Sequence, residues 1–158
     1  MYLIRFILII FFINLISSCQ KNIVVNEIKP QFENMTFDVV EKKIFFKANL
    51  PQELEKLAQQ WFNQNVKVNG IEGSIIFNVL KYDEMITSTA DGRRIDLTLG
   101  FVATLEKPSL SQTSTINGEV SSFSSIDGDY SLADFDIIIK NTQIDLITRL
   151  SKDLKSKI

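Results

Sequence analysis

The chain has 158 residues, with 17 Lys and Arg against 19 Asp and Glu, one Cys and no His. The absence of His excludes Ser-His-Asp and Cys-His nucleophile systems and imidazole metal ligands. A single Cys excludes an intramolecular disulfide and a CxxC zinc or redox site. The formal net charge of −2 argues against a phosphate-binding surface, so we expect no nucleic-acid partner.

Residues 1–18 have the pattern of a secretory signal peptide. Arg5 lies in a short basic segment, residues 6–16 form an apolar run, and the small residues Ser17 and Ser18 follow it. The apolar run is shorter than the roughly 20 residues that a membrane-spanning helix needs. We therefore interpret this segment as an export signal.

The sequence Ile16-Ser17-Ser18-Cys19 resembles the lipobox of bacterial lipoproteins, which is an aliphatic residue, two small residues and Cys. The resemblance implies that a signal peptidase recognises Ile16, Ser17 and Ser18, and that Cys19 becomes the lipidated first residue of the mature chain. Acyl chains such as palmitate, at ~0.8 kcal/mol per buried CH₂, then anchor the protein to a membrane. An Asp after the Cys often signals inner-membrane retention in such lipoproteins, so Gln20 favours the outer membrane, facing the periplasm.

We expect the mature protein to consist of the lipidated Cys and a tether (residues 19–34) followed by one periplasmic domain (residues 35–158). The tether is polar and contains Pro30, and the length that remains suits a single core. Within the domain, residues 35–47 predict a long strand with a bulge at residues 41–43, because Val, Ile and Phe are frequent there.

An amphipathic helix is predicted to open at Leu50-Pro51. Its apolar residues recur at the spacing of one helical face, at Leu50, Leu54, Leu57, Ala58 and Trp61.

Three antiparallel strands are predicted next, over residues 74–82, 95–105 and 113–123. The middle one alternates strictly between apolar and polar residues, which indicates a sheet covered on one side. Asp91-Gly92 predicts a hairpin turn between the first two strands, and Pro108-Ser109 a turn before the third.

A long helix is predicted to end the chain. Ser131 and Asp134 form a capping box at its start, and its apolar line is Leu132, Phe135, Ile139, Leu146 and Leu150. The fold class is therefore α+β. We expect a two-layer β-α-β-β-β-α sandwich, with a mostly antiparallel four-stranded sheet and two amphipathic helices on one face.

The chain offers little for catalysis. The closest carboxylate pairs, Asp83-Glu84 and Asp127 with Asp129, lie in polar, turn-like sequence, whereas a general acid needs a desolvated carboxyl group. The spacing around Asp127-Gly128-Asp129 does not match a calcium loop. We predict a non-catalytic protein with no metal and no cofactor.

Binding is the function class that remains, and two features favour it. The stretch from Ser109 to Ser125 is rich in Ser and Thr and contains a strand that we place at the sheet edge, where a partner strand can pair with it. The sheet face opposite the helices carries Val102 and Phe123 among polar neighbours.

The lipobox, the tether and this order of elements resemble the LPS-assembly lipoprotein (LptE-like) family. The local resemblance covers Gly118 to Leu154, with Tyr130 in a polar loop, Ala133-Asp134 at the opening of the last helix and Arg149-Leu150 within it. The resemblance implies an outer-membrane subunit that plugs the LPS translocon barrel, with lipid or LPS as a further candidate ligand.

Three alternatives stay open at this stage. One is the auxiliary lipoprotein of an ABC-type lipid transport system, and another is an envelope lipoprotein with the same fold and a different partner. The third is an envelope hydrolase that uses carboxylates alone. The protein partner that we expect in the envelope is a β-barrel translocon for the LPS-assembly resemblance, or a transporter for the first of these alternatives.

Overall fold

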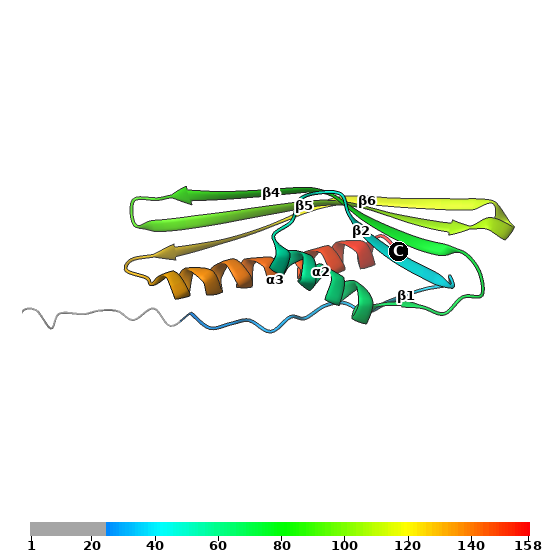
Figure 1. The fold of residues 1–158 in the computed structure, drawn as a ribbon, viewed down its shortest axis with the longest axis horizontal. Helices are drawn as coiled ribbons and strands as arrows, with labels where there is room; N and C mark the ends of the chain where they lie inside the picture. The colour runs from blue at the N-terminus through cyan, green and yellow to red at the C-terminus, as the bar shows by residue number, and fades with distance from the viewer. Residues whose placement is uncertain (1–24) are drawn as a thin grey trace, which may run out of the picture.

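The computed structural model describes residues 25–158 as two layers, a long sheet and two helices beneath it (Figure 1). The sheet has the order β2-β4-β5-β6, and α2 and α3 both lie on one of its faces. The predicted α+β two-layer fold is confirmed. The elements are β1 (Met35–Phe37), β2 (Glu41–Phe46), α2 (Gln52–Asn65), β3 (Val66–Val68), β4 (Ser74–Ser88), β5 (Gly92–Lys107), β6 (Gln112–Asp127) and α3 (Leu132–Ser156), with a short 3-10 turn, η1 (Pro108–Leu110).

The three strands β4, β5 and β6 pair antiparallel, as predicted, and β2 pairs parallel with β4. The hairpin turn at Asp91-Gly92 is confirmed, because Thr89 N–H donates to the Gly92 carbonyl at 2.9 Å. All three antiparallel strands are longer than predicted. In β4 the extra length carries Asp83 and Glu84, polar residues that pairing with β5 holds in the strand.

The prediction of a single strand over residues 35–47 is wrong. The chain turns at Asp38–Val40, so β1 pairs parallel with β3 in a separate small sheet and only β2 joins the main sheet. Val39 is fully buried at this corner, and its carbonyl accepts the Gly70 N–H at 3.0 Å. A Cβ on Gly70 would lie 2.4 Å from the Val39 nitrogen, so this approach requires glycine. The predicted bulge at 41–43 is instead the regular start of β2.

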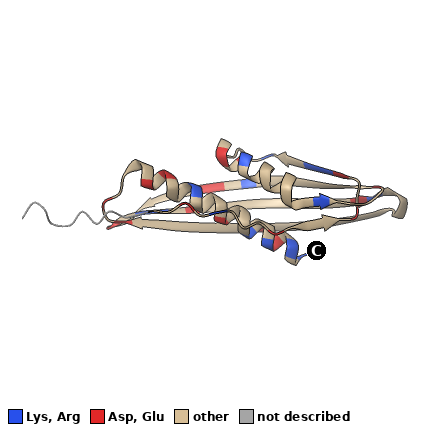
Figure 2. Ribbon diagram, turned by 90° about the horizontal axis from the view of Figure 1, so that it is seen from below, with Lys and Arg blue, Asp and Glu red and all other residues tan. Residues whose placement is uncertain are grey.

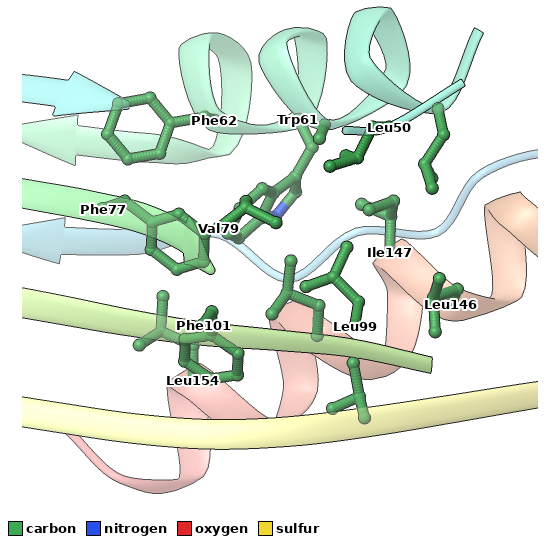
Figure 3. Close-up of a cluster of buried hydrophobic side chains, with 14 of the residues drawn as sticks. Leu50, Trp61, Phe62, Phe77, Val79, Leu99, Phe101, Leu146, Ile147 and Leu154 are labelled. Carbon is green, nitrogen blue, oxygen red and sulfur yellow. The ribbon is translucent and has the colours of Figure 1, made fainter. Parts of the chain in front are cut away.

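The core lies between the two layers and is centred on aromatic rings from both (Figure 3). Trp61 of α2 meets Phe77 of β4 edge-on with ring centroids 5.5 Å apart, and Phe77 stacks on Phe101 of β5 at 5.2 Å. Leu146, Ile147, Leu150 and Leu154 of α3 complete the packing and are fully buried. Burial of each such side chain stabilises the fold by about 1.5–3 kcal/mol.

The predicted capping box of α3 is confirmed. Ser131 Oγ accepts the Asp134 N–H at 3.1 Å, and the Asp134 carboxylate accepts the Ser131 N–H at 2.9 Å. Leu132, which the sequence pattern predicts on the apolar line, is 79 % exposed. The helix begins to pack against the sheet only at Phe135, which is buried.

Candidate interaction surface

The residues predicted for lipidation lie outside the part of the chain that the structure describes. These are Cys19 and the recognition residues Ile16, Ser17 and Ser18. Within the predicted tether, residues 25–34 run along α3 and are held to it. The Asn26 carbonyl accepts a hydrogen bond from Asn141 at 2.8 Å, and Glu33 pairs with Lys155 at 2.6 Å.

The carboxylate pairs are not brought together into a site. Asp83 and Glu84 are neighbours in β4 and therefore point to opposite faces of the sheet. Asp83 pairs with Lys81 at 3.0 Å, and Glu84 accepts the Tyr82 hydroxyl at 2.6 Å. Asp127 and Asp129 are exposed at the end of β6 and after it. Over residues 25–158, no group of three or more Asp, Glu, Cys or His side chains is placed to hold a metal ion.

Within residues 25–158, no helix or strand covers the sheet face opposite the two helices, and we call this face the outer face (Figure 1). Residues that are paired across neighbouring strands lie on the same face of a sheet, so the register shows which side chains form rows on the outer face. One row contains Phe45, Asn78, Val102 and Asn117, and the next contains Lys43, Ile76, Thr104 and Thr115. Phe123 is 59 % exposed and Val102 is half-buried, which confirms both as apolar residues on this face.

A cation lies on the exposed Phe123 ring. The Arg94 guanidinium is 4.5 Å from the ring centroid, and Asp96 holds that guanidinium through bonds of 2.7–3.0 Å. The Asp96 hydrogen bond to Arg94 keeps the pKa of this carboxyl below its ordinary value. The aromatic side chain is thus held in place on the open surface by a cation–π contact.

The strand β6 forms one edge of the sheet, which confirms the predicted edge position of the Ser/Thr-rich strand. It pairs with β5 over its whole length from Gln112 to Asp127 without a register shift. On its other side it has no strand neighbour among the described residues.

The helix α3 fixes the inner side of this edge. Buried Ser122 donates to Asp145 at 2.6 Å, and Arg149 donates to the same carboxylate oxygen at 2.6 Å. Burial alone would raise the pKa of Asp145, but the bonds from Ser122 and Arg149 outweigh it, so the pKa is lowered. The edge strand is therefore attached to α3 through a charge-assisted hydrogen bond as well as through apolar contacts.

A groove of about 920 Å³ lies on the opposite side of the molecule, between α2, α3 and residues 27–30. Its apolar lining includes Ile28, Pro30, Leu57, Ile139 and Ile144. Each helix also contributes one acidic and one basic residue to the lining, namely Glu53 and Lys56 of α2 and Asp136 and Lys140 of α3. The sequence pattern did not predict this groove, because it forms only where the segment before the first strand docks between the helices.

No helix within residues 25–158 is long and apolar enough to cross a membrane.

Two solved structures share this fold. The rare lipoprotein B from Shewanella oneidensis matches with a TM-score of 0.51 and 12% identity, over 75% of this chain and 96% of that chain. The uncharacterized lipoprotein B from Nitrosomonas europaea matches with a TM-score of 0.52 and 11% identity, over 82% and 91%. No protein-family model and no curated protein matches the chain. The likeness shows that the chain has the fold of these bacterial lipoproteins.

Proposed function

We propose that this chain is a lipid-anchored lipoprotein of the bacterial envelope that acts as a non-catalytic assembly subunit in LPS transport to the outer membrane. The observation that carries the proposal is one combination. A chain with a lipobox spelling at Ile16 to Cys19 has the fold of two solved proteins named lipoprotein B. In this role Cys19 anchors the protein and the domain inserts into the translocon barrel.

The surface chemistry of the domain supports insertion into a barrel. The lumen of an outer-membrane barrel is polar, so a subunit inside it needs a polar surface without a dominant charge. The outer face is rich in Ser, Thr and Asn, and Lys/Arg and Asp/Glu positions are interspersed along both helices (Figure 2). The elongated outline in Figure 1 suits a plug whose strands follow the long axis of a barrel.

One observation favours a second candidate, the auxiliary lipoprotein of an ABC-type lipid transport system. The groove between α2 and α3 has an apolar lining and is large enough for part of a lipid chain. The two candidates predict different partners, because a transporter subunit binds a complex with an ATPase and a substrate-binding protein.

The test is purification of the full chain from membranes through a tag after the exposed Ile158. The proposal predicts recovery of one large β-barrel protein in near-equal amount, and loss of surface LPS when the chain is depleted. Recovery of an ATPase with a substrate-binding protein would favour the transporter reading. An unchanged LPS surface after depletion would contradict the role in LPS assembly.

The anchor is tested separately with Cys19→Ala. This variant is expected to incorporate no labelled palmitate and to leave the membrane fraction, because it has no other thiol. The matched control is Ser18→Ala, which keeps a small residue before Cys19 and should be labelled like the wild type. Equal labelling of Cys19→Ala and wild type would refute lipidation at this residue.

A further inference from the structure

We infer that the free edge of β6, from Glu119 to Asp127, receives an extended, uncharged segment of the envelope partner protein as an additional strand of the main sheet. The inference rests on the proposed function in one respect, namely that the chain has a protein partner. It adds the mode of contact, which is strand addition through backbone hydrogen bonds.

The hairpin between β4 and β5 shows which backbone groups of β6 are free. The Thr89–Gly92 hydrogen bond places the backbone groups of Gly92 toward β4. Consecutive residues of a strand direct these groups to opposite sides, so the odd-numbered residues of β5 face β6. They pair with even-numbered residues of β6, as in Phe101 with Gly118. The odd-numbered residues of β6 therefore direct N–H and C=O away from the sheet.

A contact at Asn117, one of these odd-numbered positions, supports this direction of the backbone groups and limits the length of the open edge. Lys157, at the end of α3, donates to the Asn117 carbonyl at 3.1 Å. A lysine that covers an edge carbonyl blocks strand addition at that point. The open part of the edge is thus the stretch from Glu119 to Asp127, beyond the reach of this lysine.

The two edges of the same sheet differ in how they are protected. On the β4 side, β2 is short, the register shifts between Val79 and Lys81, and Asp83 and Glu84 add charge to the uncovered part. These are devices that prevent edge-to-edge pairing. By contrast, residues 120–126 of β6 have an unbroken register and include no charged residue and no Pro. This stretch is the part of the sheet edge without such a device, which indicates a place for a partner strand.

The side chains on the open stretch define the chemistry of the occupant. On the outer face the residues beside an added strand are Ser121, Phe123 and Ser125, and Phe123 is the large apolar contact. Glu119 already pairs with Lys81 at 3.1 Å across β5. The edge thus favours an uncharged segment with a β-branched or aromatic residue opposite Phe123, since such cross-strand pairs stabilise sheets.

A second copy of this chain is a poorer occupant for electrostatic reasons. The open stretch is centred on Phe123. Antiparallel pairing of two copies about that residue places Glu119 opposite Asp127 of the other copy, twice. Like charges directly opposite one another destabilise a sheet, so we assign the edge to a different protein.

The test uses Ser125→Pro in the full chain, with Ser88→Pro as the matched control. Both residues direct their N–H to a free edge, Ser125 on β6 and Ser88 on β4, so neither proline removes a hydrogen bond within the sheet. Ser125→Pro is expected to lower recovery of the co-purified partner by roughly tenfold, the size expected when one or two hydrogen bonds are lost. The control is expected to retain the partner. Ser125→Lys, compared with Ser88→Lys, is the second pair and disturbs the backbone less.

Amide exchange gives an independent readout on the wild-type chain. The Phe123 and Ser125 amides should exchange rapidly in the free chain and slow by roughly tenfold or more in the purified complex. The Ser88 amide should exchange at the same rate in both. A benzophenone side chain at position 125 should crosslink to the co-purified partner.

The outcomes separate the two proposals. If the partner is recovered equally with Ser125→Pro and Ser125→Lys, and the edge amides stay unprotected, strand addition is refuted while the proposed function stands. A crosslink from position 125 to a second copy also overturns the inference. If the wild-type chain purifies without a protein partner, both proposals fail.

Discussion

The Lys42→Met substitution removes a lysine of strand β2 that caps the C-terminal end of the neighbouring helix α2. Lys42 lies in β2, and its ammonium group donates to the carbonyls of Phe62, Asn63 and Val66 at 3.2, 2.8 and 2.6 Å. Phe62 and Asn63 lie in the last turn of α2 and Val66 is the residue that follows the helix, which has no basic residue in its own last turn. Lys42 thus supplies both the hydrogen bonds and the positive charge that a helix C-terminus favours.

The expected loss follows from these contacts. A hydrogen bond to a charged group contributes about 1.5–3 kcal/mol, and the helix dipole adds roughly 0.3–1 kcal/mol. The three carbonyls share one ammonium group and water reaches part of the site, so these terms do not add fully. We expect Lys42→Met to lower the free energy of unfolding by about 2 kcal/mol, equivalent to a Tm decrease of roughly 6–8 °C. Burial, and to a smaller extent nearby Lys67, lowers the pKa of Lys42.

The matched control is Lys43→Met, the next residue along β2. Lys43 points to the outer face and pairs at 2.9 Å with Glu41, and both side chains are more than half exposed. Such an exposed pair contributes about 0–1 kcal/mol. Urea unfolding followed by circular dichroism measures both variants. Stabilities of the two variants within about 0.5 kcal/mol of each other would refute the capping role of Lys42.

Three further variants test the fold around the candidate edge. Gly118→Ala places a Cβ 2.7 Å from the Phe101 ring and should lower stability by about 1–3 kcal/mol, whereas Gly100→Ala, whose nearest contact is 3.1 Å away, should be nearly neutral in the same thermal melts. Asp145→Asn should destabilise at pH 7. The pKa of Asp145 in the folded protein is lowered from 3.8, so the ionised carboxylate contributes its full stabilisation above that value and loses it as the pH falls through the folded-state pKa. The difference in unfolding free energy between Asp145→Asn and wild type should therefore shrink below about pH 4 in acid titrations. Ser131→Ala should cost about 1 kcal/mol and increase amide exchange in the first turn of α3, and unchanged exchange there would contradict the capping role.

The sequence predicted the central strand well because one side of it is buried and the other is open. The odd-numbered residues from 95 to 103 are buried and the even-numbered ones, apart from Gly100, are half-buried. The matching alternation of apolar and polar residues is visible in the sequence without any knowledge of neighbouring strands. The sequence predicts one strand over residues 35–47 because the two short strands there have similar composition and no Gly or Pro marks the corner between them. The corner depends on Val39 packing against Gly70, a contact between residues far apart in the sequence.

The edge position of β6 was also predictable from the sequence. The composition of the segment from Ser109 to Ser125 indicates an edge position, because its many Ser and Thr side chains offer little apolar surface to bury. The extent of the open stretch was not predictable. It depends on Lys157, which reaches the Asn117 carbonyl only after α3 has folded back along the sheet.

The free edge is held in a fixed conformation by the layer beneath it. The even-numbered residues of β6 point inward, where Val120 and Ile126 are buried in the core and Ser122 is bonded to Asp145. The backbone N–H and C=O groups of the odd-numbered residues point to the free edge, and the even-numbered residues between them hold the strand against the core. A strand with this alternation is already extended before a partner arrives, so ordering β6 adds little to the entropy cost of association. Loosening the inner side, as in Asp145→Asn, should therefore weaken partner recovery even though that residue lies on α3 and faces away from the outer surface.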